Sequence, residues 1–291
     1  MCRLYGLQAT HSTRPACELL DAQNALIRQS REDARGLSNP HGWGVGHVAN
    51  GQTACFRQVQ PATESADYRR AALDAEGTLV LAHVRRATVG TPDHANTHPF
   101  RQGPALLIHN GHVPAFDRVR PRLLDRLDAP RRQAIQGRTD SEHVFALLLQ
   151  LRSERPEAPL HAVTRQAVHD VQEWVQDVGT GTTVHAVDGD LSALPHDDLV
   201  QILGLNLLWT DGEVLGGARL NRTLWTLERT RVPTCSLCGT RHADPPPDAD
   251  YHATVLASER ITGEDWTAVP NASAFSAAPH GALHVEPLGA P

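Results

Sequence analysis

The chain has 291 residues, of which 40% are hydrophobic and 21% are charged, and its formal net charge is −6. This is the composition of an ordinary globular protein, and the acidic balance gives no electrostatic case for binding nucleic acid. All 27 basic residues are arginine, which excludes chemistry that needs a lysine, such as a Schiff base or a phosphate-binding P-loop.

No apolar run approaches the ~18–20 residues that a membrane helix needs, and the first residues lack the apolar segment of a signal peptide. Five cysteines, with only one close pair among them, do not follow the pattern of a disulfide framework. We therefore expect a cytoplasmic protein that binds neither nucleic acid nor membrane.

Cys2 follows Met1 and precedes an alternating apolar and polar stretch that predicts a strand. Removal of Met1 would put a thiol and a free α-amine on the same residue. With a pKa of ~7.7–8.0, that amine has an appreciable neutral fraction near neutral pH. In its neutral form it can take the thiol proton itself. On its position alone, however, Cys2 is more simply explained as a small buried residue.

The next hundred residues alternate between helix and strand patterns. Apolar residues at helical spacing predict a helix over Ala16–Arg28. The run Gly42–Val48 and the turn at Asn50-Gly51 predict two short strands joined as a hairpin. Short apolar runs then predict buried strands at Leu79–Val84 and Ala105–His109.

The middle of the chain is predominantly helical. The arginine-rich segment Phe116–Arg138 also carries aspartates, which favours a solvated helix face over a nucleic-acid patch. Thr139 and Glu142 have the spacing of a capping box, so a helix is expected to begin there and continue through Val144–Leu151. Leu160–Val178 predicts a further amphipathic helix.

The last third of the chain is predicted to form strands, at Val200–Thr210, Arg222–Glu228 and Tyr251–Ser258. A proline-rich loop with two cysteines occupies about 233–250. We expect residues 1–271 to form one domain of the α+β class, with stacked sheets covered by helices. Residues 272–291 are rich in Ala, Pro and Gly, and we expect them to be a loosely ordered tail.

Four short segments besides Cys2 carry residues suited to chemistry: His83–Gly90 (HVRRATVG), Asn96–Phe100 (NTHPF), His109–Gly111 (HNG) and Arg138–Glu142 (RTDSE). Each has an ordinary explanation when taken alone, such as a solvated arginine, a turn or a helix cap. Together, in this order and spacing, they resemble the class II glutamine amidotransferases. These are N-terminal nucleophile hydrolases with a four-layer αββα sandwich, so that fold is expected here.

The resemblance implies a role for five residues. Cys2 is the nucleophile that attacks a γ-glutamyl amide, and the side-chain amide of Asn110 and the backbone N–H of Gly111 form the oxyanion hole. Arg85 binds the α-carboxylate of the substrate through its planar fork, and Asp140 receives the α-ammonium. A cofactor for catalysis is not implied.

The opening MCRLYG, the HGWGVG run and the absence of a synthase domain are similar to the stand-alone branch of this family. That branch includes γ-glutamyl hydrolases of ergothioneine synthesis and related glutathione-degradation subunits. The expected reaction is hydrolysis of glutamine or a γ-glutamyl conjugate. The alternatives are a glutaminase subunit that delivers ammonia to a separate synthase partner, and a catalytically silent interaction domain with a zinc loop. The partner subunit of such a chain could be a synthase or a peptidase. N-terminal-cysteine acylases bind apolar acyl groups, so Arg85 and Asp140 argue against them.

Arg86 departs from the aromatic residue that is often found at this position in synthase-linked members of the family. The sequence assigns no role to Arg3.

The loop at about 233–250 has the form of half a zinc site. Cys235 and Cys238 are spaced to hold one tetrahedral metal through a tight turn, and His242 follows closely. A closed structural site needs a fourth ligand, for which His252 is the sequence-based guess. The alternative is a dithiol loop without a metal.

Overall fold

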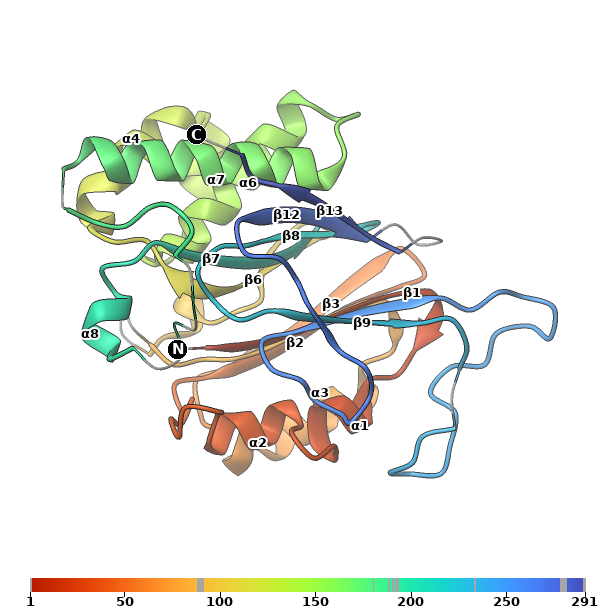
Figure 1. The fold of residues 1–291 in the computed structure, drawn as a ribbon. Coiled ribbons are helices and arrows are strands. Elements are labelled where there is room, and N and C mark those ends of the chain that lie inside the picture. Colours follow the sequence, from red (N-terminus) through yellow and green to blue (C-terminus); the bar gives the residue numbers. More distant parts are fainter. Residues whose placement is uncertain are drawn as a thin grey trace.

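A computed structural model describes residues 2–87, 92–179, 181–187, 189, 191, 194–232, 234–277 and 282–289. Two antiparallel sheets lie face to face, and helices cover the outer face of each sheet (Figure 1). Buried apolar residues form three clusters, one between the sheets and one between each sheet and its helices. This arrangement confirms the expected αββα sandwich of the α+β class.

The first sheet has seven strands in the order β11-β9-β10-β1-β4-β2-β3. Successive side chains of β1 point to opposite faces of the sheet, and both faces are covered. Leu4 faces the other sheet, whereas Tyr5 and Leu7 face the helices. The strands are β1 Arg3–Thr13, β2 Trp43–Ala49, β3 Gln52–Gln58, β4 Gly77–Val84, β9 Trp225–Arg229, β10 Ala253–Ala257 and β11 Thr267–Ala268.

The second sheet has six strands in the order β13-β12-β8-β7-β6-β5. Ile108, Leu208 and Phe275 point from it toward the first sheet, where they pack against Leu4 and its neighbours. The strands are β5 Phe100–Gln102, β6 Ala105–His112, β7 Gly204–Thr210, β8 Leu215–Arg219, β12 Ser273–Ala277 and β13 Leu283–Pro287.

Three short helices cover the first sheet: α1 Ala16–Leu20, α2 Leu26–Arg31 and α3 Ala66–Asp74, which follows the 3₁₀ turn η1 Ala62–Glu64. The prediction of one continuous helix over Ala16–Arg28 is wrong. Asn24 interrupts it, because its backbone N–H donates to Ile261 O at 3.2 Å and its side chain donates to Glu259 at 3.0 Å. These tertiary hydrogen bonds replace those that a continuous helix would make.

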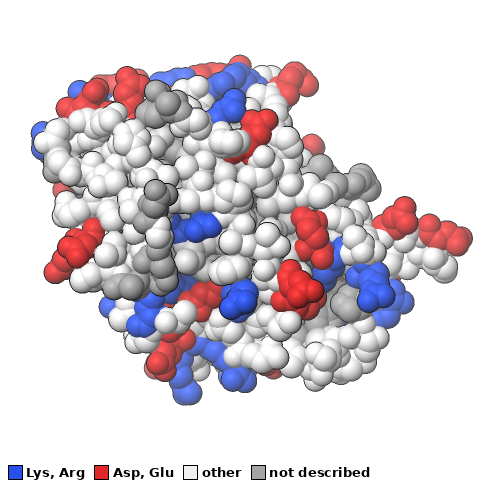
Figure 2. Space-filling model, viewed as in Figure 1, with Lys and Arg blue, Asp and Glu red and all other residues white. Residues whose placement is uncertain are grey.

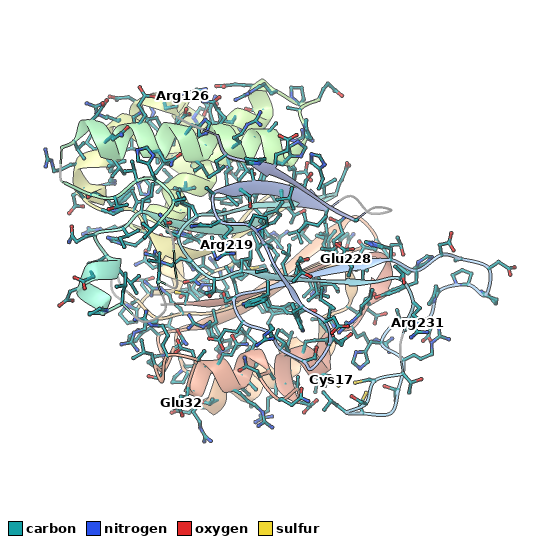
Figure 3. All side chains as sticks on the ribbon, in the orientation of Figure 1. Cys17, Glu32, Arg126, Arg219, Glu228 and Arg231 are labelled. Atoms are coloured by element: carbon teal, nitrogen blue, oxygen red, sulfur yellow. The ribbon has the colours of Figure 1, made fainter. Side chains whose placement is uncertain are left out.

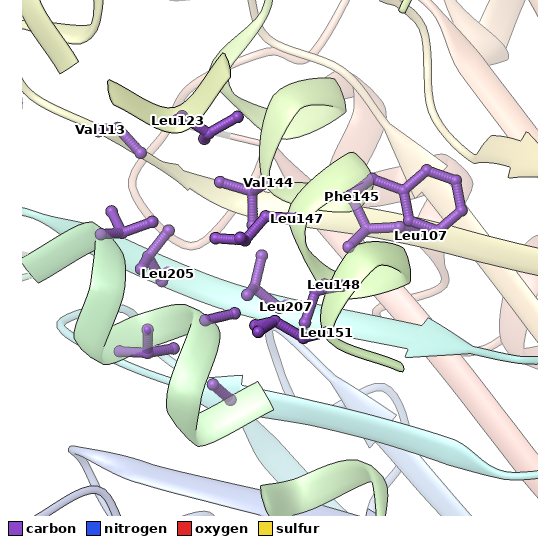
Figure 4. Packing of buried hydrophobic residues seen from close by; sticks show 14 of the residues in the cluster. Leu107, Val113, Leu123, Val144, Phe145, Leu147, Leu148, Leu151, Leu205 and Leu207 are labelled. Carbon is purple, nitrogen blue, oxygen red and sulfur yellow. The ribbon is translucent and has the colours of Figure 1, made fainter. Parts of the chain in front are cut away.

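The second sheet is covered by longer helices. Val144, Leu147 and Leu151 of one of them pack against Leu205 and Leu207 of the sheet (Figure 4). The predicted capping interaction is present, since Thr139 Oγ1 accepts from the N–H of Glu142 at 3.3 Å. These helices are α4 Phe116–Arg126, α5 Ala129–Ala134, α6 Asp140–Glu154 and α7 Leu160–Asp177. Two shorter elements, α8 His196–Leu199 and the 3₁₀ turn η2 His94–Asn96, lie in connecting segments. Among the described helices, none has the length and hydropathy to cross a bilayer.

The expectation of a loosely ordered tail over 272–291 is wrong for its described residues. Strand β12 pairs with β8 on one side and β13 on the other, and Phe275 is fully buried opposite Gly217. A Cβ on Gly217 would lie 2.5 Å from the Phe275 ring, so the glycine makes room for it. The two adjacent glycines of β8 also explain why the sequence pattern missed that strand.

Candidate active site

Cys2 immediately precedes β1, which lies between β4 and β10 in the first sheet. Its thiol is half-buried and lies against the backbone of Arg86, with the Arg86 N–H 3.3 Å from Sγ and the Arg86 carbonyl 3.4 Å away. No hydrogen bond within the described residues joins this thiol to a histidine. These contacts therefore supply no side-chain base for the Cys2 thiol.

Arg85 and Asp140 lie on the β4 side of Cys2, and both are buried. Arg85 follows the last residue of β4, and its N–H donates to Gly42 O at 2.8 Å. Burial lowers the pKa of the Arg85 guanidinium, whereas the negative charges of Cys2 and Asp140 raise it. The three predicted residues are therefore close enough to interact electrostatically. Thr88, Val89 and Gly90, which end the HVRRATVG motif, lie outside the described residues.

Asp140 is the first residue of α6, and its carboxylate is held by backbone donors. Oδ2 accepts from the N–H of Val113 at 2.8 Å, and Oδ1 accepts from the N–H of Ser141 at 2.7 Å. Negative charge is favourable at a helix N-terminus, so this position stabilises the ionised carboxylate. A buried guanidinium and a buried carboxylate at one site form a pair of charges suited to an α-amino acid head group.

Asn110 and Gly111 come from β6 of the second sheet. The Asn110 side-chain amide donates to Ser258 Oγ at 3.4 Å, and the same hydroxyl accepts from the N–H of Leu4 at 3.1 Å. This shared partner brings Asn110 next to the start of β1. A Cβ on Gly111 would lie 1.8 Å from the carbonyl oxygen of Gly204, so the close pairing of β6 and β7 requires a glycine here.

Arg3, which the sequence left without a role, anchors the residue before it. Its guanidinium forms buried ion pairs with Glu259 at 2.5 Å and Asp33 at 2.9 Å, and it donates to the carbonyl oxygen of Cys2 at 2.9 Å. Ser258 and Glu259, which follow β10, were not among the site residues that the sequence predicted. These contacts hold the backbone of Cys2 in place from the β10 side.

Three buried histidines of the predicted motifs lie behind the site and are neutral. Burial lowers the pKa of His83 to about 3, and it also lowers the pKa values of His98 and His109. His83 Nε2 bonds to the carbonyl oxygen of His109 at 3.1 Å, and the His83 and His98 rings lie 4.3 Å apart. These side chains support the backbone of the site and are not placed to act as a base for Cys2.

A second cluster of reactive side chains lies far from Cys2, where α1 meets the loop between β9 and β10 (Figure 3). The ligand atoms of Cys17, Cys235, Cys238 and His242 all lie within 4.8 Å of one another, so this group could bind a metal. His252, the sequence-based guess, is not part of it, because its Nε2 pairs with Glu228 at 2.6 Å. The fourth residue is Cys17, which is buried in helix α1.

A family model described as "Glutamine amidotransferases class-II" matches residues 1–229. The "Probable glutamine amidotransferase DUG3" of Saccharomyces cerevisiae is 25% identical over 94% of this chain and 80% of the relative. The "Gamma-glutamyl-hercynylcysteine sulfoxide hydrolase" of Mycolicibacterium smegmatis is 33% identical over 45% of this chain and 55% of the relative. The identity to the mycobacterial protein is higher but covers a shorter stretch.

The same fold occurs in solved structures. A "glutamine aminotransferase class-II domain protein" from Silicibacter pomeroyi aligns with a TM-score of 0.60, covering 98% of this chain and 99% of its own. The sequence identity of this pair is 18%, so the likeness concerns the fold alone.

Proposed function

The chain belongs to the class II glutamine amidotransferases, and from this membership we propose how its residues hydrolyse a γ-glutamyl amide. The observation that carries the proposal is that these groups gather at the start of β1. Arg85 interacts electrostatically with Cys2 and Asp140, and the Asn110 amide shares the Ser258 hydroxyl with the N–H of Leu4. The pair of charges binds the α-carboxylate and α-ammonium of the glutamyl group. That binding fixes the γ-carbonyl carbon against the thiol.

The reaction proceeds through a thioester on Cys2. The α-amine of the processed chain takes the thiol proton, and the thiolate forms a bond to the γ-carbonyl carbon. Asn110 Nδ2 and the Gly111 N–H stabilise the resulting oxyanion. The carbon–nitrogen bond then breaks, and the leaving amine or ammonia takes the proton from the α-ammonium. Water attacks the thioester, its proton returns through the amine, and glutamate leaves with the thiol restored.

Release of glutamate tests this proposal. A chain that begins at Cys2 is expected to hydrolyse glutamine or another γ-glutamyl amide, and to leave N-acyl amides without an α-amino acid head group intact. Turnover of such acyl amides in preference to γ-glutamyl amides would contradict the assigned roles of Arg85 and Asp140. Glutamine hydrolysis that is slow alone and rises when a synthase or peptidase subunit is added would assign the chain to a two-subunit enzyme.

We also propose that Cys17, Cys235, Cys238 and His242 hold a structural zinc ion. Three thiolates and one imidazole make a closed tetrahedral donor set, in which neighbouring ligand atoms are roughly 3–4 Å apart. Cys238 Sγ lies 3.2 Å from His242 Nε2, and all four ligand atoms lie within 4.8 Å of one another, which fits that geometry. A bound ion would join helix α1 to the loop between β9 and β10, and it takes no part in the reaction at Cys2.

A further inference from the structure

A large cavity lies beside Asn110 and Arg3, the residue that follows Cys2 in the chain. It has a volume of about 570 Å³, which is within the range of small-molecule sites. Asn110, Arg3 and Ser258 line one end of it, and neither Arg85 nor Asp140 is among the residues described in its wall. This space is called the arginine cavity below, after the lining residues Arg3, Arg35, Arg219, Arg222 and Arg260.

The order of the strands indicates which part of a substrate the cavity receives. Strand β1 runs antiparallel to both of its neighbours, so its first residues meet the ends of β4 and β10. The glutamyl head group lies at the end of β4, where Arg85 is found. Ser258 and Glu259 follow the end of β10 and line the arginine cavity. A substrate whose γ-carbonyl carbon lies at Cys2 therefore extends its leaving group toward the arginine cavity.

Three arginines of the cavity have no carboxylate partner among the described residues. They donate instead to main-chain carbonyl groups: Arg35 to Leu194 at 2.6 Å, Arg219 to Arg222 at 2.8 Å and Arg222 to Leu199 at 3.0 Å. Arg3 differs, since it forms ion pairs with two carboxylates, those of Asp33 and Glu259. Arg222 is buried, whereas Arg35 and Arg219 are half-buried. A guanidinium group that is shielded from water and has no counter-ion is costly, and a bound anion would reduce that cost.

The charge of these arginines persists at neutral pH and is local to the cavity. Burial lowers the pKa of Arg222 to about 10, and it lowers the pKa values of Arg35 and Arg219 as well. All three remain protonated under ordinary conditions.

On the face that Figure 2 shows, acidic and basic residues are interspersed, so the cavity is not part of a broad basic surface. Arg219 lies between the two sheets in Figure 3, near the centre of the same face.

We propose that the arginine cavity binds a carboxylate on the leaving group of the substrate. The inference rests on the proposed function and narrows its substrate class to γ-glutamyl amides of an amino acid or a short peptide. A carboxylate matches the planar fork of a guanidinium and gains charge-assisted hydrogen bonds. Arg35 offers such a donor, because its buried Nη1 has no hydrogen-bond partner among the residues that the structure describes. Ammonia, the leaving group of glutamine, would leave the cavity without an anion.

The test compares two substrates that differ in one group, γ-glutamylglycine and γ-glutamylglycinamide, with the chain that begins at Cys2. We expect kcat/KM to be about 10- to 100-fold higher for γ-glutamylglycine, as for the loss of one charge-assisted interaction. Arg35→Gln and Arg219→Gln are each expected to bring this ratio toward one. Arg231→Gln, an exposed arginine outside the cavity, is the matched control and should keep the wild-type ratio.

Each outcome separates this inference from the proposed function. Equal hydrolysis of both substrates by the wild-type chain would overturn the leaving-group site and leave γ-glutamyl hydrolysis standing. Hydrolysis of neither substrate nor of glutamine would overturn both. If inorganic phosphate changes glutamine hydrolysis while the ratio of the two substrates stays at one, the cavity binds a free anion and the leaving-group assignment is wrong. Circular dichroism of each variant checks that the fold is retained.

Discussion

Replacement of Cys2 by alanine is expected to lower kcat/KM for glutamate release by about 10⁴- to 10⁶-fold, the usual consequence of losing a nucleophile. The substitution removes the thiol that forms the thioester, and neither the oxyanion hole nor the pair of charges can replace it. Its effect on folding should be small. The thiol is half-buried and its hydrogen bonds are two long contacts with the backbone of Arg86. We expect the free energy of unfolding to change by about 1 kcal/mol or less.

Cys55→Ala is the matched control for this prediction. Cys55 is also a free, half-buried cysteine, and it lies in β3, away from the start of β1. The control variant should retain wild-type turnover, and denaturant unfolding should report whether either variant has lost stability. Substantial glutamate release by a folded Cys2→Ala protein would show that another residue supplies the nucleophile.

Loss of the proposed zinc ion is expected to have the largest effect on stability. Cys17→Ser and Cys235→Ser each remove a ligand from a closed site, so bound zinc should fall from about one ion per chain to almost none. Because metal binding adds to the stability of the folded state, we expect Tm to fall by roughly 5–10 °C. The measurements are metal analysis of the purified protein and thermal unfolding with and without a chelator.

Cys55→Ser controls for the loss of a thiol as such, and it should change neither the zinc content nor the response to a chelator. Glutamate release by the Cys17→Ser variant, assayed well below its Tm, should remain close to the wild-type rate, since the cluster lies far from Cys2. A wild-type protein that is stable and free of metal would refute the zinc site.

The elements that the sequence predicted correctly are those whose pattern is local. The capping spacing of Thr139 and Glu142 predicted the start of α6, and Asp140 at that position is held by nearby backbone donors. The apolar run Leu79–Val84 predicted the strand that ends at Arg85. In both cases the side chain and the pattern that predicts its setting belong to the same short segment.

The residues that the sequence missed are brought to their sites by the pairing of distant segments. Glu259 reaches Arg3 only because β10 pairs with β1, and 256 positions separate the two residues in the chain. Cys17 joins the cysteines of a loop more than 200 positions away in the same manner. In the sequence, Cys17 fits an apolar position of the predicted helix Ala16–Arg28, and its burial agrees with that position. No spacing rule connects residues that only the folded sheet places together.

The central claim is that Cys2, as the first residue of the processed chain, forms a covalent bond to a γ-glutamyl group. The most direct test treats the protein with the glutamine analogue 6-diazo-5-oxo-norleucine and locates the modification by mass spectrometry of its peptides. The account predicts a single adduct, on an N-terminal peptide that begins at Cys2 and has lost Met1, with protection by a γ-glutamyl substrate. An adduct on another cysteine, or no adduct on a folded protein that begins at Cys2, would contradict it.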